Sequence, residues 1–237
     1  MTGPALTYVW GLSPSSFGAH AEYMCLPETA PLILQANGMS FEDAVAISDG
    51  APTALTFLRD KAKVRAGQRI LINGASGAVG AYAVQLGKHY GAEVTGVCSG
   101  ANVALVKSLG ADLVIDYTQT DFAREGRTYD VIFDAVGKRS YWECRAALSS
   151  AGIYLTTVPS ISIAAHMLLT ANSRRHKAMF VAAGLMQNKQ NLVYLQELFQ
   201  SGKLRPVIDK RYPLDCIAEA HRYVDTGRKR GNVIVTM

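Results

Sequence analysis

The stretch Leu71–Asn102, LINGASGAVGAYAVQLGKHYGAEVTGVCSGAN, decides the fold of this chain. It has the pattern of a buried strand, a glycine-rich turn, a helix and a second strand. Gly74, Gly77 and Gly80 lie three residues apart, in the pattern G-x-x-G-x-x-G. Such a turn presents backbone amides and a helix N-terminus together, and this arrangement binds the pyrophosphate of a dinucleotide. A tight strand–helix turn without a ligand is the alternative interpretation.

Strand and helix patterns alternate around this stretch. Apolar strand segments are predicted at 69–74, 93–98, 113–117, 129–136 and 152–157, and the segments between them have helical spacing. The helices at 77–90 and 101–110 end near Gly91 and Gly110, as expected for glycine caps. This alternation predicts an α/β fold with a doubly wound parallel sheet, the Rossmann arrangement.

The flanking segments have other patterns. One or two helices are predicted at 41–64, a strand at 177–184, a helix at 191–202, and an extended tail from Leu204 that contains one more helix and a closing strand at 233–237. An alternating segment at 15–28 is typical of a strand in an antiparallel or barrel-like unit.

Composition indicates a globular chain. Of 237 residues, 49% are hydrophobic and 18% are charged, and no apolar run approaches the roughly 20 residues that span a bilayer. The four cysteines stand singly, without the spacing of a zinc site, and the start has no signal-peptide pattern, so we expect a cytoplasmic protein with reduced thiols. Basic runs at 174–177 and 227–231 accompany no nucleic-acid motif, and we expect solvated faces there and no nucleic-acid binding.

The end of the second predicted strand distinguishes the two nicotinamide cofactors. NAD-binding proteins usually place Asp or Glu there to bind the ribose hydroxyls. The segment VCSGAN, 97–102, has no carboxylate, and the next one along the chain is Asp112. A carboxylate would repel a 2′-phosphate, whereas Ser99 and Asn102 can donate hydrogen bonds to it. The residues therefore favour NADPH.

Five ordered segments carry a resemblance to a known family. They are FGAHAEYMCLPE, INGASGAVG, VCSGANVALVKSLGADLVIDYTQTDF, YDVIFDAVGK and RPVIDKRYPLDCIAEAHRYVDTGRKRGNVIVTM. Together they resemble the medium-chain dehydrogenase/reductase superfamily, specifically its zinc-free quinone-oxidoreductase (zeta-crystallin-like) branch. The resemblance runs from about Gly11 to Met237.

The resemblance implies a domain organisation. Residues 1–45 would be the remnant of a GroES-like barrel, 46–203 the Rossmann domain, and 204–237 a segment that returns to the barrel. Most of the barrel-like catalytic domain of relatives precedes the FGAHAEY strand and has no counterpart here, so the lid over the substrate looks truncated. Zinc ligands would also lie largely in the absent part, and no metal site is expected.

The resemblance also implies site residues. The pyrophosphate would lie at Ser76, Gly77, Ala78 and Val79; the adenosine 2′-phosphate at Ser99 and Asn102; the adenine beside Tyr117; the nicotinamide ribose at Ala135, Val136 and Gly137; the nicotinamide near Thr157 and Val158; and Thr53 and Asn232 would reach the cofactor from either side. Tyr117 has the alternative role of an ordinary strand-end aromatic, and Thr53 that of a helix N-terminal hydroxyl.

The implied activity is hydride transfer from NADPH to quinones or to activated carbonyls and alkenes, weakened by the truncated lid. No residue stands out as a general acid or base; His20 is the nearest candidate, and a surface or packing role is favoured for it. The alternative is a non-catalytic NADPH-binding module, a nucleotide sensor or a remnant. An unpaired edge strand at Lys177–Gly184 predicts a homodimer.

Overall fold

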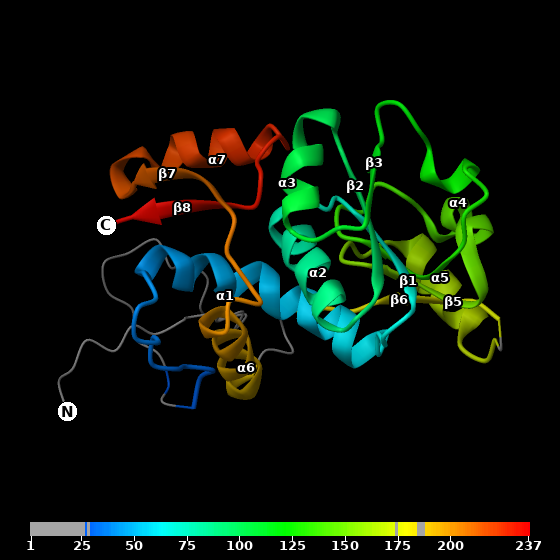
Figure 1. Cartoon of the computed structure of the whole chain (residues 1–237), viewed down its shortest axis with the longest axis horizontal. Coiled ribbons are helices and arrows are strands. Elements are labelled where there is room, and N and C mark those ends of the chain that lie inside the picture. Colours follow the sequence, from blue (N-terminus) through cyan, green and yellow to red (C-terminus); the bar gives the residue numbers. More distant parts are fainter. Residues whose placement is uncertain (1–26, 28, 174, 184–187) are drawn as a thin grey trace.

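The computed structural model describes residues 27, 29–173, 175–183 and 188–237, and contains one six-stranded sheet in the order β3-β2-β1-β4-β5-β6 (Figure 1). All neighbouring strands pair in parallel. The strands are β1 (Arg69–Asn73), β2 (Glu93–Cys98), β3 (Leu113–Asp116), β4 (Tyr129–Asp134), β5 (Leu148–Thr156) and β6 (Lys177–Phe180). The doubly wound parallel sheet predicted from the sequence is confirmed.

Helices cover both faces of the sheet. The helices are α1 (Phe41–Leu55), α2 (Ala78–His89), α3 (Val103–Ser108), α4 (Tyr141–Cys144), α5 (Ile161–Thr170), α6 (Lys189–Gln200) and α7 (Ile217–Asp225). One core joins α1, α2 and α6 to the β1 side chains Ile70 and Ile72, and a second joins α4 and α5 to Leu71. Because successive strand residues point to opposite faces, β1 is buried on both sides.

Helix α1 leads directly into the sheet. The hydroxyl of Ser40 caps its first turn by accepting from the Asp43 amide at 3.1 Å. The helix continues without a break as a π-helix over Thr56–Lys61, and the Phe57 ring stacks on Phe133 of β4 with centroids 4.7 Å apart. The segment predicted as one or two helices is therefore one continuous helical unit packed on the sheet.

Two predicted strands end earlier than expected, for a local reason in each case. Strand β4 ends at Asp134 because that carboxylate accepts the amides of Val136 and Gly137 and turns the chain. Strand β6 ends at Phe180, after which the Ala183 amide donates to the Val181 carbonyl at 2.8 Å in a tight turn.

The C-terminal segment forms a separate two-stranded sheet. Strands β7 (Ile208–Pro213) and β8 (Asn232–Thr236) pair directly in parallel, and α7 connects them along the chain. Figure 1 shows the two strands at one end of the molecule. The strand predicted at 15–28 lies, apart from Pro27, outside the described residues, so the barrel remnant stays a prediction. The division at residue 45 also stays a prediction, and α1 is continuous across it. Within the described ranges, no helix is long and apolar enough to cross a membrane.

Candidate cofactor site

The glycine turn joins β1 to α2 at the carboxyl edge of the sheet. Gly74 has φ +81°, a conformation that disfavours side chains, and a Cβ there would lie 2.6 Å from Val136 Cγ1. A Cβ at Gly80 would overlap the Gly74 carbonyl oxygen, so α2 lies close against the turn. Gly77 is the N-cap of α2 and gives its first amides no side-chain partner. Uncapped amides at the positive end of a 12-residue helix suit a bound anion.

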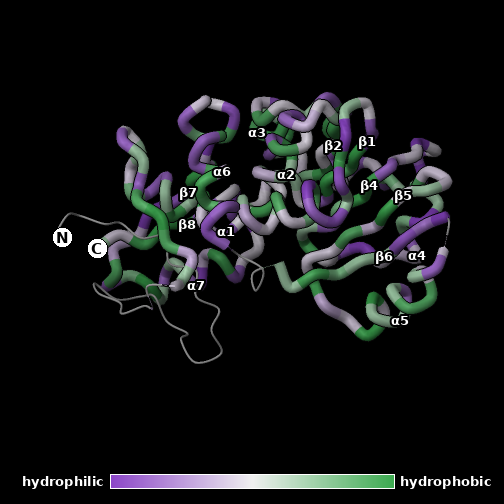
Figure 2. Tube along the Cα trace, turned by 90° about the horizontal axis from the view of Figure 1, so that it is seen from below, coloured by the Kyte–Doolittle hydropathy of each residue, from purple (hydrophilic) through white to green (hydrophobic). Residues whose placement is uncertain are grey.

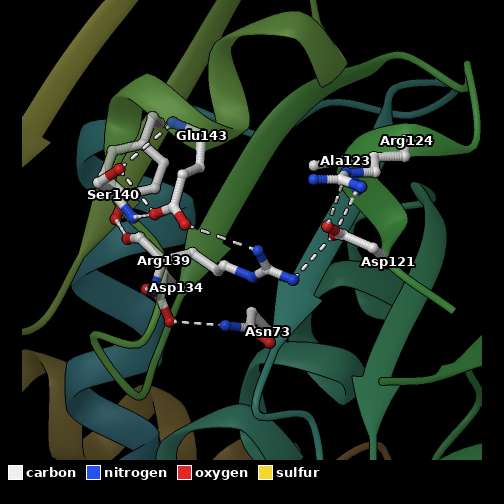
Figure 3. Close-up of polar contacts among 9 residues, drawn as sticks. Asn73, Asp121, Ala123, Arg124, Asp134, Arg139, Ser140 and Glu143 are labelled. Atoms are coloured by element: carbon white, nitrogen blue, oxygen red, sulfur yellow. Dashed lines mark hydrogen bonds and ion pairs between the residues drawn. The ribbon is translucent and has the colours of Figure 1, made fainter. Parts of the chain in front are cut away.

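A buried carboxylate organises the loop after β4. Asp134 is fully buried, and its Oδ1 accepts from Asn73 Nδ2 at 2.9 Å and from the amides of Val136 and Gly137 at 3.2 and 3.0 Å. Its Oδ2 accepts from the Arg139 amide at 2.8 Å. Figure 3 shows the bond between Asn73 and Asp134 that ties β1 to β4. Asp134 was not among the predicted site residues, although its carboxylate follows an apolar strand and stands three residues before a glycine, a pattern visible in the sequence.

The Arg139 side chain holds the same loop from outside (Figure 3). Its guanidinium lies 2.8 Å from Asp121 and 3.7 Å from Glu143, and it stacks over the Phe122 ring at 5.5 Å from the centroid. Glu143 and Ser140 form a reciprocal capping box, in which the amide and hydroxyl of Ser140 lower the pKa of the Glu143 carboxyl. The loop that leaves β4 is therefore held by bonds on both of its sides.

The structure brings together the residues predicted for the adenosine 2′-phosphate. The Asn102 side chain donates to Ser76 Oγ and to Ser99 Oγ, each at 3.2 Å, and so links the glycine turn to the end of β2. Tyr117 follows β3, and its amide donates to the Cys98 carbonyl at 3.0 Å. Its side chain is 60% exposed. An exposed ring beside a cluster of hydroxyl and amide groups is suited to stacking on a base.

The residues predicted for the nicotinamide end also lie together. The Thr157 hydroxyl donates to the Ala135 carbonyl at 3.3 Å, which joins the ends of β5 and β4. Gly137 has φ +67°, and a Cβ there would lie 2.6 Å from the Val158 Cβ. Val136 and Val158 remain partly exposed and form apolar surface at this edge.

Thr53 and Asn232 approach the turn from other elements. Thr53 lies one turn after Gly50 on α1, and a Cβ at Gly50 would overlap the Ala78 carbonyl oxygen, so this face of α1 lies against the start of α2. The Asn232 side-chain Nδ2 donates to the Val207 carbonyl at 3.1 Å and to Tyr82 Oη at 3.4 Å. These bonds direct that nitrogen into the protein, and a contact of Asn232 with the cofactor stays a prediction.

Gly231 and Lys229, which precede Asn232, were not predicted as site residues. The Gly231 amide donates to the Ser76 carbonyl at 2.8 Å, and Gly231 bridges to Gly77. Lys229 Nζ donates to the Gly231 carbonyl at 2.8 Å; burial lowers the pKa of this ammonium, and the carboxylates of Asp49 and Asp209 oppose that shift. The run GRKRG was interpreted as a solvated face, yet it supplies a cation next to the turn.

Candidate acid–base and metal groups are few at this edge. A cavity of about 170 Å³ beside Gly137 and Val158 includes His166, whose Nδ1 lies 2.7 Å from the Ser162 carbonyl and whose ring contacts Tyr141. His20 lies outside the described residues. In the part of the chain that the structure describes, no three His, Cys, Asp or Glu side chains are placed to hold a metal ion.

The described cysteines near the sheet are packing residues. Cys98 and Cys144 are both buried, and burial raises the pKa of their thiols to about 11 and about 12. A thiol with so high a pKa carries almost no thiolate at neutral pH and is a poor nucleophile. Both cysteines are therefore packing residues.

Comparisons with known proteins agree with this arrangement. Residues 109–235 match the zinc-binding dehydrogenase family model. The trans-enoyl reductase pgmF of Aspergillus terreus is 31% identical, over 94% of this chain and 66% of its own length. The chloroplastic NADPH-dependent alkenal/one oxidoreductase of Arabidopsis thaliana is 30% identical, over 94% of this chain and 54% of its own.

Solved structures share the fold. The quinone oxidoreductase from Coxiella burnetii superposes with a TM-score of 0.78 at 28% identity, covering 87% of this chain and 64% of that one. The chain thus spans between about half and two thirds of the length of these relatives. From the family match and these likenesses, the chain belongs to the zinc-binding dehydrogenase family of the medium-chain dehydrogenase/reductase superfamily, in its quinone-oxidoreductase-like branch.

Proposed function

We propose that this chain binds NADPH across the carboxyl ends of β1, β2, β4 and β5. The observation that carries the proposal is the uncapped N-terminus of α2 behind a glycine turn that no Cβ could enter at Gly74 or Gly80. Amides of α2 and the Lys229 ammonium would neutralise the pyrophosphate. Ser99 and Asn102 would donate to the 2′-phosphate, with Tyr117 against the adenine.

The proposed reaction is reduction of an electron-poor acceptor. The bound cofactor supplies hydride chemistry, and the protein supplies distance and orientation. Ala135, Val136, Gly137, Thr157 and Val158 would border the nicotinamide and keep that face apolar. Three relatives are by name an enoyl reductase, an alkenal/one oxidoreductase and a quinone oxidoreductase, which supports an activated alkene, a carbonyl or a quinone as the acceptor. Water can supply the proton, so a protein acid is not required.

A non-catalytic NADPH-binding module is the second candidate. Binding the cofactor requires the glycine turn and the loops after β2, β4 and β5, but no acid or base, so these residues can hold NADPH without turning an acceptor over. A cytoplasmic location also stays a prediction, and the two buried free thiols suit a reducing compartment.

We also propose a homodimer through the free edge of β6. Helix α5 lies beside this strand, and Figure 2 shows it as a hydrophobic segment on the outside of the molecule. Ile161, Leu168 and Leu169 are 92%, 81% and 79% exposed. A second copy would cover this apolar surface and complete the hydrogen bonding of the strand edge.

Calorimetry with NADPH and NADH tests the cofactor proposal. The Asn102→Asp variant should weaken NADPH binding by at least about tenfold, because a carboxylate would repel the 2′-phosphate, and should weaken NADH binding less. Gln200→Glu, an amide-to-acid change at an exposed position of α6, is the matched control. If neither cofactor binds the unaltered chain, the proposal is wrong.

Turnover separates the two candidates. The same sample is mixed with 9,10-phenanthrenequinone or an enone, and loss of NADPH absorbance is followed. Turnover supports the reductase. Binding of NADPH without turnover of any acceptor supports the module.

A further inference from the structure

A second cavity lies at the opposite edge of the sheet from the cofactor site. It encloses about 570 Å³ between the chain that enters β1, the end of α5, and strands β5 and β6. Lys177, the first residue of β6, pairs with Ile153 of β5, and both line it. The cofactor site is at the carboxyl ends of the strands, so the sheet separates the two sites.

Cationic side chains dominate the rim of this cavity. Lys61, Lys63, Arg65 and Lys177 line it, and none of the residues that line it is acidic. As far as the described residues go, none of these four side chains has an ion-pair or hydrogen-bond partner. Gathering unpaired cations around one hollow raises their mutual repulsion, and a bound anion relieves it.

The described carboxylates on the elements around the cavity do not line it. Asp60, next to Lys61, pairs with Arg59 at 2.6 Å. Asp130, at the start of β4, accepts from the Arg69 amide at 2.9 Å and from the Ser149 hydroxyl at 2.8 Å, bonds that hold it away from the four cations but leave its charge in place. The four cations that line the cavity therefore outnumber the one carboxylate of this pair without an ion-pair partner.

The cationic loop is held in place by the backbone. The Val64 amide donates to the Leu58 carbonyl at 2.9 Å, and the Arg65 amide donates to Gln68 Oε1 at 2.8 Å. Lys63, the residue before Val64, has φ +51°, which lysine adopts rarely, and is the one non-glycine residue with a positive φ among those the structure describes. The loop backbone is therefore held in one conformation, so binding does not carry the entropic cost of ordering the loop.

The floor of the cavity is apolar. Ile153, Met167, Ala178 and Met179 line it, and the Thr170 hydroxyl there is already satisfied by the His166 carbonyl and the Ala178 amide. A site with an apolar floor and a cationic rim matches a ligand that has an apolar body and an anionic head. The volume is within the range of small-molecule pockets, about 300–1,000 Å³.

A simpler explanation accounts for only one of these cations. Lys61 lies in the last turn of the π-helix, where a cation interacts favourably with the free carbonyls. Lys63 and Arg65 lie beyond that helix, and Lys177 comes from a different element. Helix stabilisation does not explain why all four converge on one hollow.

We propose that this cavity is a binding site for an organic phosphate, a phosphate monoester with an apolar or aromatic body. The phosphate dianion would lie among Lys63, Arg65 and Lys177, and the apolar body would lie on Met167 and Met179. The site is separate from the cofactor site, and the proposal does not depend on which nucleotide that site takes.

The test uses 1-naphthyl phosphate as the probe and the full chain saturated with NADPH, followed by calorimetry. Binding tighter than that of inorganic phosphate and of 1-naphthol is expected, because only the ester has both parts. Lys63→Gln and Arg65→Gln should each weaken the binding of 1-naphthyl phosphate by about fivefold, because each removes one exposed ion pair with the phosphate. Lys107→Gln, on exposed α3, is the matched control and should bind as the unaltered chain does.

Three results would overturn the proposal. They are an absence of 1-naphthyl phosphate binding, equal binding by the Lys63→Gln variant, and binding of 1-naphthyl phosphate no tighter than that of inorganic phosphate. Lys177 lies on the strand proposed for dimerisation, so Lys63 and Arg65 carry the test. Thermal unfolding of each variant verifies that it is folded. NADPH binding, measured without the probe, is expected to be the same in all of them.

Discussion

At the scale of single residues, the shape of the cofactor site is set by bonds that its own residues make with one another. Asn102 and Ser99 were predicted from the sequence because small polar residues stood where a carboxylate is usual, and Ser76 from the resemblance of the glycine turn; the structure links the three side chains. Asp134 and Gly231 were not predicted. Their roles depend on partners distant in sequence, Asn73 and Ser76, and no local pattern identifies such partners.

Replacing Asp134 tests its role in supporting the loop after β4. In Asp134→Asn one carboxylate oxygen becomes an NH₂ group, which would face donors such as the Arg139 amide. We expect a loss of about 2–4 kcal/mol in the free energy of unfolding, together with weaker NADPH binding. Chemical denaturation and calorimetry measure the two effects. Asp225→Asn, at the exposed end of α7, is the control, and equal stability of both variants would contradict this role.

His89 makes the stability depend on pH. Burial lowers its pKa from 6.5, and the nearby Lys203 ammonium lowers it further, while Nε2 lies 3.1 Å from Tyr194 Oη. The unfolded chain therefore binds a proton more readily than the folded one. Stability should be greatest above pH 6.5 and fall as the pH drops from there through the lowered pKa.

Denaturation at several pH values measures this effect. The His89→Asn variant should lose less stability than the unaltered chain between neutral and mildly acid pH. His176→Asn is the control. A His89→Asn variant with the same pH dependence as the unaltered chain would show that this group is not responsible.

At the scale of elements, the sheet was predictable, whereas the start of β5 and the ends of β4 and β6 were not. Strands β1 to β4 begin where the apolar runs begin, and Gly91 and Gly110 follow α2 and α3 as expected. Strand β5 begins at Leu148, earlier than predicted, because Leu148 pairs with Tyr129 across a register shift. The polar and small residues that follow Leu148 conceal this pairing in the sequence. The π-helix and the parallel pairing of β7 with β8 depend on tertiary contacts and leave no periodic signal.

The contact between α1 and α2 predicts that one glycine-to-alanine substitution in a helix lowers the stability of the protein instead of raising it. Glycine to alanine inside a helix normally stabilises by about 1 kcal/mol. At Gly50 the added Cβ would overlap the Ala78 carbonyl oxygen, which is backbone and cannot swing aside. We expect Gly50→Ala to destabilise by about 2 kcal/mol instead and to weaken NADPH binding by shifting α2. Val45→Leu, on the exposed face of α1, is the control; a Gly50→Ala variant that gains stability would contradict the contact.

At the scale of the whole molecule, the exposed apolar face of α5 predicts association. Light scattering at micromolar concentration should give the mass of a dimer. Leu168→Glu and Leu169→Glu should give a monomer, because a buried unpaired carboxylate at an interface is strongly unfavourable. Leu34→Glu tests a leucine of similar exposure, 70%, away from β6 and should stay dimeric. A monomeric unaltered chain would exclude the proposed dimer.

The bond from the Gly231 amide to the Ser76 carbonyl has a consequence for biosynthesis. Everything that builds the six-stranded sheet lies before Lys189, whereas the segment that closes over the glycine turn follows the sheet by about fifty residues (Gly231 against Phe180). A ribosome synthesises the sheet first, and domains can begin to fold as they emerge. A nascent chain therefore contains all of its sheet strands before it contains the residue that bonds the Ser76 carbonyl, and the glycine turn is the last part of this edge to be completed.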